Sequence, residues 1–271
     1  MFARVSEESG YRESLLPDPG EFDGDTVLAA EAVRQVGGIS ADGPVPNVTR
    51  LMERLGVGVL APLEPGVADE KDHVSMSRPA DAKERPLVAM VAACPGDRAR
   101  LSLAHELGHL IFDRSRAKPI PSTRSPEEKR AYDFASALLV PDAVMRQTVS
   151  EALTLHGYLP LKAKYGVSVA ALILRARRLG LISEDRARSL HIQRSSQGWR
   201  RNEPVPVKNE KTTLLEQCYA RAFPGRNNVQ VSEATGIMVS LLDDWLPATA
   251  VTAVVSSLAE WRARRGGSPP W

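Results

Sequence analysis

The stretch His105-Glu106-Leu107-Gly108-His109 has the residue types and spacing of a metal-dependent hydrolytic site. Two histidines four residues apart project from one face of a helix, because one turn takes about 3.6 residues, and can bind a single metal ion. Glu106 follows the first histidine, so its carboxylate lies beside the same site, where a general base would activate a metal-bound water. The alternative is a helix with two chance histidines, but its apolar flanks and a downstream carboxylate favour the metal site.

A catalytic zinc ion commonly has three protein ligands and one open position for water. Residues 125–141 predict a second helix that can supply the third ligand, with Ser125 as its N-cap and prolines at its first position and after its end. Glu128 lies on the apolar stripe of this helix and therefore points inward, where a carboxylate needs a partner such as a metal. Glu127 and Asp133 face away from that stripe, which makes Glu128 the preferred ligand.

These residues resemble the ImmA/IrrE family of metallopeptidases, whose signature is HExxH followed by a helix reading roughly E-x-x-A-N-x-F-A-x-x-L-L-x-P. Here the second helix, from Glu128 to Pro141, reads E-K-R-A-Y-D-F-A-S-A-L-L-V-P. The resemblance implies that Zn²⁺ is held by His105, His109 and Glu128, with Glu106 as the catalytic acid and base. Tyr132 stands where the family usually has asparagine, so any support that this asparagine gives to a ligand imidazole must be provided differently.

The resemblance covers about residues 40–200 and implies more than the site. It implies an α+β fold, with a zincin-like catalytic domain whose small mixed sheet lies beside the HExxH helix, followed by a helical C-terminal region. It also implies a zinc-dependent endopeptidase that cuts a helix-turn-helix transcriptional repressor at one site and so relieves repression, in mobile-element or stress control. Longer members often carry a DNA-binding helix-turn-helix domain before the peptidase; we expect none here, since only about forty residues precede the first family-like segment.

Apolar runs and their punctuation predict the elements around the site. We expect helices at residues 26–36 and 47–55, and strands at 57–61 and 86–93, with another short strand within 66–83. The later strand runs directly into the HExxH helix, which places the sheet beside the active-site cleft. An edge strand there would bind substrate backbone in extended form.

Composition shifts divide the chain into five expected parts. Residues 1–25 are expected to be a flexible leader, 26–155 the peptidase domain, and 156–199 a helical extension. Residues 200–212 are charged and rich in proline, as in a linker, and precede a C-terminal helical region at 213–271. Short helices are expected there at residues 213–223, 231–236, 238–245 and 248–264.

Residues 161–182 have the outline of a helix-turn-helix, with Ser168 capping the second helix and Gly180 ending it. Arg175, Arg177 and Arg178 on that helix raise the alternative of a DNA-binding regulator. The helix is otherwise mostly apolar and leaves few residues to read bases, so packing and substrate docking are favoured. A second alternative is a metal-binding partner of a repressor that binds without cleaving, as a toxin-like protein would.

The remaining histidines and cysteines are less informative. His73 lies in a polar stretch and is expected to be an exposed loop residue rather than an oxyanion ligand, and His156 and His191 are expected to be structural or exposed. Cys94, at a strand end, is expected to be a small apolar filler.

Composition excludes several classes of protein. The formal net charge is +2, with 43% hydrophobic and 25% charged residues, which is ordinary for a globular protein and shows no bulk basic bias toward nucleic acid. Two cysteines cannot form a disulfide framework, which favours a cytoplasmic location. No apolar stretch approaches a membrane span, and the first 25 residues are too acidic for a signal peptide.

Overall fold

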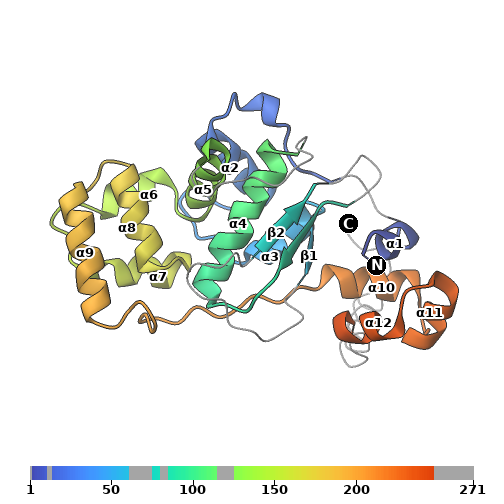
Figure 1. Cartoon of the computed structure of the whole chain (residues 1–271). Helices are drawn as coiled ribbons and strands as arrows, with labels where there is room; N and C mark the ends of the chain where they lie inside the picture. The colour runs from blue at the N-terminus through green and yellow to red at the C-terminus, as the bar shows by residue number, and fades with distance from the viewer. Residues whose placement is uncertain (1, 11–13, 61–74, 80–84, 115–124, 247–271) are drawn as a thin grey trace.

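A computed structural model of the chain describes residues 2–10, 14–60, 75–79, 85–114 and 125–246 (Figure 1). The fold is α+β, as predicted: a small sheet lies among many helices. The strands are β1 (Gly58–Leu60), β2 (Ser75–Arg78) and β3 (Leu87–Met90), in the order β1-β3-β2. β1 pairs with β3 in parallel and β2 pairs with β3 antiparallel, so the sheet is mixed.

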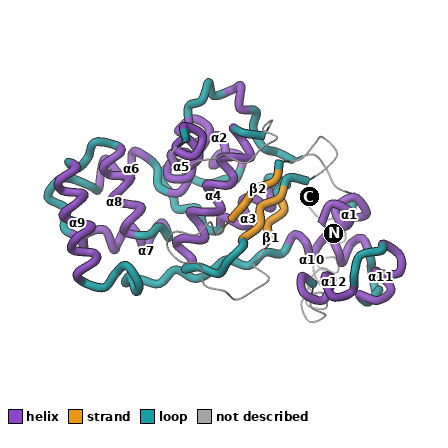
Figure 2. Tube along the Cα trace, viewed as in Figure 1, coloured by secondary structure: helices purple, strands orange, loops and turns teal. Residues whose placement is uncertain are grey.

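All three expected strands form, each within its predicted range. Val59 and Val88 occupy paired positions and are both buried, which places the β-branched side chains of neighbouring strands against the same core. β2 lies at the edge of the described sheet and contacts the central helix α4 (Gly96–Phe112) (Figure 2). The strand nearest the predicted metal helix is therefore an edge strand.

Three further helices lie around α4, two in close contact with it and the third packed on one of these two. They are α2 (Thr26–Val36), α3 (Val48–Arg54) and α5 (Pro126–Leu139), each with a side-chain N-cap, from Asp25, Asn47 and Ser125 respectively. α5 packs against both α4 and α2 (Figure 1). The predicted ranges of all three helices agree with the structure to within one or two residues.

The helices after α5 continue the same core. They are α6 (Asp142–Thr148), α7 (Leu159–Tyr165), α8 (Val169–Arg178) and α9 (Glu184–Ser196), with a 3-10 turn at Leu155–Tyr158. α7, Gly166 in the left-handed conformation and the Ser168 cap of α8 form the predicted helix-turn-helix outline. One cluster of buried side chains runs from Phe22 to Trp199, so the core is continuous across the division expected at residue 156.

Residues 200–213 cross the molecule as an extended strap between α9 and α10 (Leu214–Ala222) (Figure 1). The strap contains no helix or strand, as expected for a linker, but its side chains are fixed to the catalytic part. Oε1 of Glu203 lies 2.7 Å from Nζ of Lys162, and Asn209 donates to the carbonyl of Cys94. Gly96 has no room for a Cβ, because the backbone of Val207 and Lys208 passes directly over it.

A second, smaller core joins the two ends of the described chain. It contains α10, α11 (Asn228–Thr235), α12 (Val239–Trp245) and, from the other end, α1 (Phe2–Glu8). Residues 2–8 were expected to belong to a flexible leader, and here the structure differs. Val5 is fully buried against side chains such as Leu215 and Tyr219, a contact more than 200 residues away in sequence that local composition cannot reveal.

Two expectations lie outside the described residues, namely the helix at 248–264 and the loop around His73. Within the described ranges, no helix combines the length and apolarity needed to cross a membrane.

Candidate metal centre

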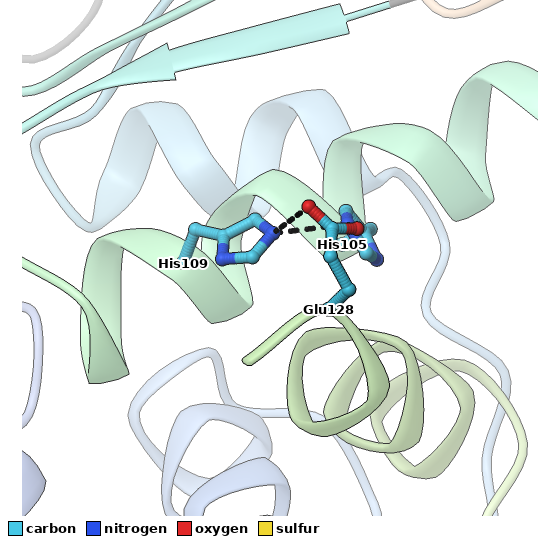
Figure 3. A group of neighbouring side chains, drawn as sticks. All are labelled: His105, His109 and Glu128. Atoms are coloured by element: carbon cyan, nitrogen blue, oxygen red, sulfur yellow. Dashed lines mark hydrogen bonds and ion pairs between the residues drawn. The ribbon is translucent and has the colours of Figure 1, made fainter. Parts of the chain in front are cut away.

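The structure brings together His105, His109 and Glu128, the three ligands expected from the sequence (Figure 3). Both histidines project from α4, and Glu128 approaches from the first turn of α5. One ligand atom from each residue lies within 4.8 Å of the other two. The side chains are only 19%, 11% and 20% exposed, so the group is largely shielded from solvent but not fully buried.

The spacing of these atoms suits one small cation. Nε2 of His105 lies 3.0 Å from Nε2 of His109 and 3.1 Å from Oε2 of Glu128, and Nε2 of His109 lies 3.5 Å from Oε1 of Glu128. Ligands around a tetrahedral zinc at about 2.1 Å are separated by roughly 3.4 Å. Two nitrogens and one carboxylate oxygen also form the donor set of many catalytic zinc sites, so the residues present fit zinc.

Gly108 explains how Glu128 reaches the histidines. A Cβ on Gly108 would lie only 3.0 Å from the Cα of Ala131 and 3.1 Å from the ring of Phe134. The missing side chain therefore lets α4 and α5 approach closely, one turn beyond Glu128. Ser125 fixes the start of α5, because its hydroxyl accepts a hydrogen bond from the Glu128 amide.

Asp113 holds His109 in the orientation that a metal ligand needs. Oδ2 of Asp113 lies 2.8 Å from Nδ1 of His109, and Oδ1 of Asp113 accepts a hydrogen bond from Arg130 over 2.5 Å. A carboxylate at Nδ1 favours the tautomer whose Nε2 keeps its lone pair, directed here toward His105 and Glu128. Arg130 also stacks on the ring of Phe112, 5.2 Å from its centroid, which restrains the guanidinium.

The charges of the site shift two pKa values in opposite directions. Burial would lower the pKa of His109, but the hydrogen bond to Asp113 and the charges of Glu106 and Glu128 outweigh it, so this pKa is raised. Burial would raise the pKa of Asp113, but its bonds to His109 and Arg130 hold that pKa below its ordinary value. The raised pKa of His109 reflects the carboxylates gathered around this histidine, and such carboxylates also favour binding of a divalent cation.

Glu106 is buried and oriented by the edge strand. Its Oε1 accepts a hydrogen bond from the hydroxyl of Ser75 on β2 over 3.0 Å. Its charge contributes to the raised pKa of His109, which places the carboxylate near the metal ligands. Glu106 lies outside the three-residue ligand group of the described chain. Such a position suits a proton acceptor beside a metal better than a ligand to it.

Tyr132 does not replace the asparagine of the resembling family at the ligands. Arg178 of α8 stacks over its ring, 4.3 Å from the centroid, and burial is the largest cause of its raised pKa, with Ser136 hydrogen-bonded to its hydroxyl. Tyr132 therefore joins α5 to α8. Carboxylate support for a ligand imidazole comes instead from Asp113.

The basic residues of α8 are largely engaged in ion pairs. Arg175 contacts Asp142 over 2.5 Å, Arg177 contacts Glu184 over 3.4 Å, and Arg178 contacts Asp133. Asp133 thus lies away from the metal ligands, as expected from the helix stripe. These pairs neutralise charge that contact with DNA phosphates would require.

The other expected bystanders lie apart from the ligand group. Cys94 is buried in the main core, where burial raises the pKa of its thiol, as expected of an apolar filler. His156 packs edge-on against Trp199, with ring centroids 5.1 Å apart. Burial, followed by the charges of Arg194 and Arg177, lowers the pKa of His191.

Sequence reasoning missed two residues that orient the site, Asp113 and Ser75. Asp113 follows His109 by four residues on the same helix face, a spacing that was available as a signal. Ser75 lies 31 residues before Glu106 in a polar stretch and carries no comparable signal. Its role depends on how the sheet packs against α4.

A protein-family model matches the catalytic part of the chain. Residues 52–177 match the family model Peptidase_M78, described as the IrrE N-terminal-like domain. The matched range contains all three residues of the ligand group as well as Glu106. No curated protein matches the chain significantly.

Proposed function

Because residues 52–177 match the IrrE N-terminal-like domain of metallopeptidases, we propose that this chain is a zinc-dependent endopeptidase of the ImmA/IrrE type with a zincin-like catalytic domain. The observation that carries the proposal is the convergence of His105, His109 and Glu128, with ligand atoms within 4.8 Å of one another. Those three residues would hold the metal. When bound, zinc lowers the pKa of a water toward about 7 and polarises a carbonyl oxygen.

Other residues of the chain would transfer the protons of the reaction and orient the groups that take part in it. Glu106 would take the proton of the attacking water at its free carboxylate oxygen, because Ser75 already occupies Oε1, and would pass that proton to the leaving amine. Asp113 would keep His109 in the metal-binding tautomer. Ser75 and Asp113 are therefore positioning residues, while Glu106 is the catalytic residue.

The geometry also supports a peptide substrate in extended form. β2 is an edge strand that contacts α4, and Met76 on it is 60% exposed. A peptide added along this edge would hydrogen-bond to the strand that orients Glu106. The substrate we propose is a helix-turn-helix repressor cut at one site. That identity rests on the family resemblance alone.

The proposal is tested with the purified chain, zinc and each helix-turn-helix protein encoded by a gene next to its own. We expect discrete, chelator-sensitive cleavage, and we expect Glu106→Gln to keep zinc while losing about 10²- to 10⁴-fold in rate. Glu128→Gln should lose zinc, whereas the matched change Glu127→Gln on the same turn should keep both zinc and activity. Tight repressor binding without cleavage would instead support the non-cleaving partner, and DNA binding unaffected by Glu106→Gln would support the regulator.

A further inference from the structure

A surface cavity of about 540 Å³ lies on another part of the molecule, where the strap crosses α3, α4 and α7. Its walls come from residues 44–47 and 50, Arg100, residues 163–166 and residues 207–211, and include none of the metal-ligand group. The volume falls within the range of sites that bind small molecules, roughly 300–1,000 Å³.

The charge of this cavity is one-sided. Five cationic side chains and one carboxylate line it: Arg50, Arg100, Lys164, Lys208, Lys211 and Glu210. Arg50 is offset by Glu53, 2.9 Å away, which does not line the cavity. Lys208 and Lys211 are exposed and form no ion pair within the described part of the chain. Like charges focused in a concave surface raise the local concentration of anions.

Arg100 forms the floor of the cavity and is held in place on several sides. It is only 6% exposed, and it donates to the carbonyl of Val45 over 2.6 Å. Gly166, which has a φ of +65°, leaves the space for it, since a Cβ there would lie 2.8 Å from Nε of Arg100. The guanidinium is thus fixed before any ligand arrives, which reduces the entropic cost of binding.

Glu210 occupies the position that an anion would take. One of its carboxylate oxygens pairs with Arg100, and the other accepts the amide of Thr49 over 2.7 Å. Glu210 compensates for Arg100 and Glu53 for Arg50. The three lysines of the cavity remain available to a ligand with more than one negative charge.

We propose that this cavity binds a small multiply charged anion, of the class of phosphorylated metabolites, and that Glu210 acts as its internal competitor for Arg100. Arg100 lies on α4, five residues before His105, so such a ligand would touch the helix that carries both metal-binding histidines. The proposal is independent of peptidase activity, because it concerns binding to side chains outside the metal centre.

The test measures pyrophosphate and inorganic phosphate binding to the zinc-loaded full chain by calorimetry, at constant ionic strength set with chloride. We expect saturable binding of pyrophosphate that is tighter than that of phosphate. Lys208→Gln together with Lys211→Gln should weaken it by at least about tenfold, since each hydrogen bond to a charged group contributes roughly tenfold or more. Glu210→Gln should strengthen binding, and the exposed control Arg146→Gln should leave it unchanged.

Each contrary result overturns a stated part of the proposal. Absence of saturable binding overturns the site. Pyrophosphate binding that is unchanged in the double lysine variant also overturns it, because such binding would reflect chelation of the zinc, which does not depend on those lysines. Binding that Glu210→Gln fails to strengthen overturns its role as competitor. Salt-sensitive binding of double-stranded DNA without saturable pyrophosphate binding assigns the cations to a nucleic-acid surface instead. Unchanged far-UV circular dichroism of the variants shows that they fold.

Discussion

Asp113, the C-cap of α4, and His109, in the last turn of that helix, are joined by a hydrogen bond of 2.8 Å between Oδ2 and Nδ1. This bond links the metal site to a second residue pair, because the other oxygen of Asp113 accepts from Arg130 on α5. The two helices that supply the metal ligands are therefore also tied together behind the ligands. The histidine, the carboxylate and the guanidinium form one continuous polar network.

The first prediction concerns Asp113. Asp113→Asn should weaken zinc binding by about 10- to 100-fold, because an amide no longer favours the required tautomer of His109. Competition against a chromophoric chelator measures this affinity. The control is Asp185→Asn, at the exposed start of α9, which should bind zinc as the unchanged protein does. Equal affinities for the two variants would contradict the role given to Asp113.

The second prediction concerns Gly108. Replacing glycine by alanine inside a helix ordinarily stabilises it by roughly 0.5–1 kcal/mol. Here we expect the opposite sign, because the new Cβ meets the backbone of Ala131 and the ring of Phe134 and must push α5 away. Gly108→Ala should lower both the free energy of unfolding and the bound zinc, measured by denaturation and elemental analysis. A more stable variant with full zinc content would show that the helices tolerate separation.

How far the sequence predicted this site depends on whether the signal is local. The grouping of the three expected ligand residues was predictable because the histidine spacing and the apolar stripe of α5 each lie within one helix. The caps Asn47, Ser125 and Ser168 acted where expected. Ser75 was not predictable, because its partner Glu106 is brought to it only by packing of the sheet against α4.

The same distinction between local and long-range signals explains why the attachment of the strap was not predicted. A stretch of charged residues and prolines is typical of a mobile linker, yet Glu203 and Glu210 reach cations 41 and 110 residues earlier in the chain. Glu53 likewise accepts the amides of Thr213 and Leu214 at the start of α10. Such long-range pairs leave no periodic pattern in the sequence. Composition alone therefore could not show whether the strap is attached to the rest of the molecule or mobile.

The third prediction tests how firmly the strap is attached. Nζ of Lys162 is buried between Oδ2 of Asp97, at 2.6 Å, and Oε1 of Glu203, at 2.7 Å. Lys162→Met removes the cation between these two carboxylates and leaves Glu203 only its more distant partner Arg194, 3.7 Å away. Removing one partner of a buried ion pair typically costs about 3–5 kcal/mol. Chemical denaturation should show a loss of this size. Adding Glu203→Gln to Lys162→Met should recover part of the lost free energy of unfolding. A double variant as unstable as the single variant would mean that the two carboxylates do not repel each other.

The fourth prediction concerns pH and Tyr158. Burial, opposed by Arg186 and reinforced by Glu151, raises the pKa of this tyrosine to about 12, from an ordinary value of 10.0. A raised acid pKa means that the unfolded chain releases its proton first, so the contribution to stability is complete below pH 10 and is lost as pH rises toward 12.

The variant Tyr158→Phe has no ionisable hydroxyl and therefore removes that dependence of stability on pH. Its hydroxyl has no hydrogen-bond partner in the described structure, so the variant should match the original within about 1 kcal/mol at neutral pH. Above pH 10 the free energy of unfolding of the original protein should fall relative to that of the phenylalanine variant. Parallel curves across this range would mean that the hydroxyl ionises as easily in the folded protein as in the unfolded chain.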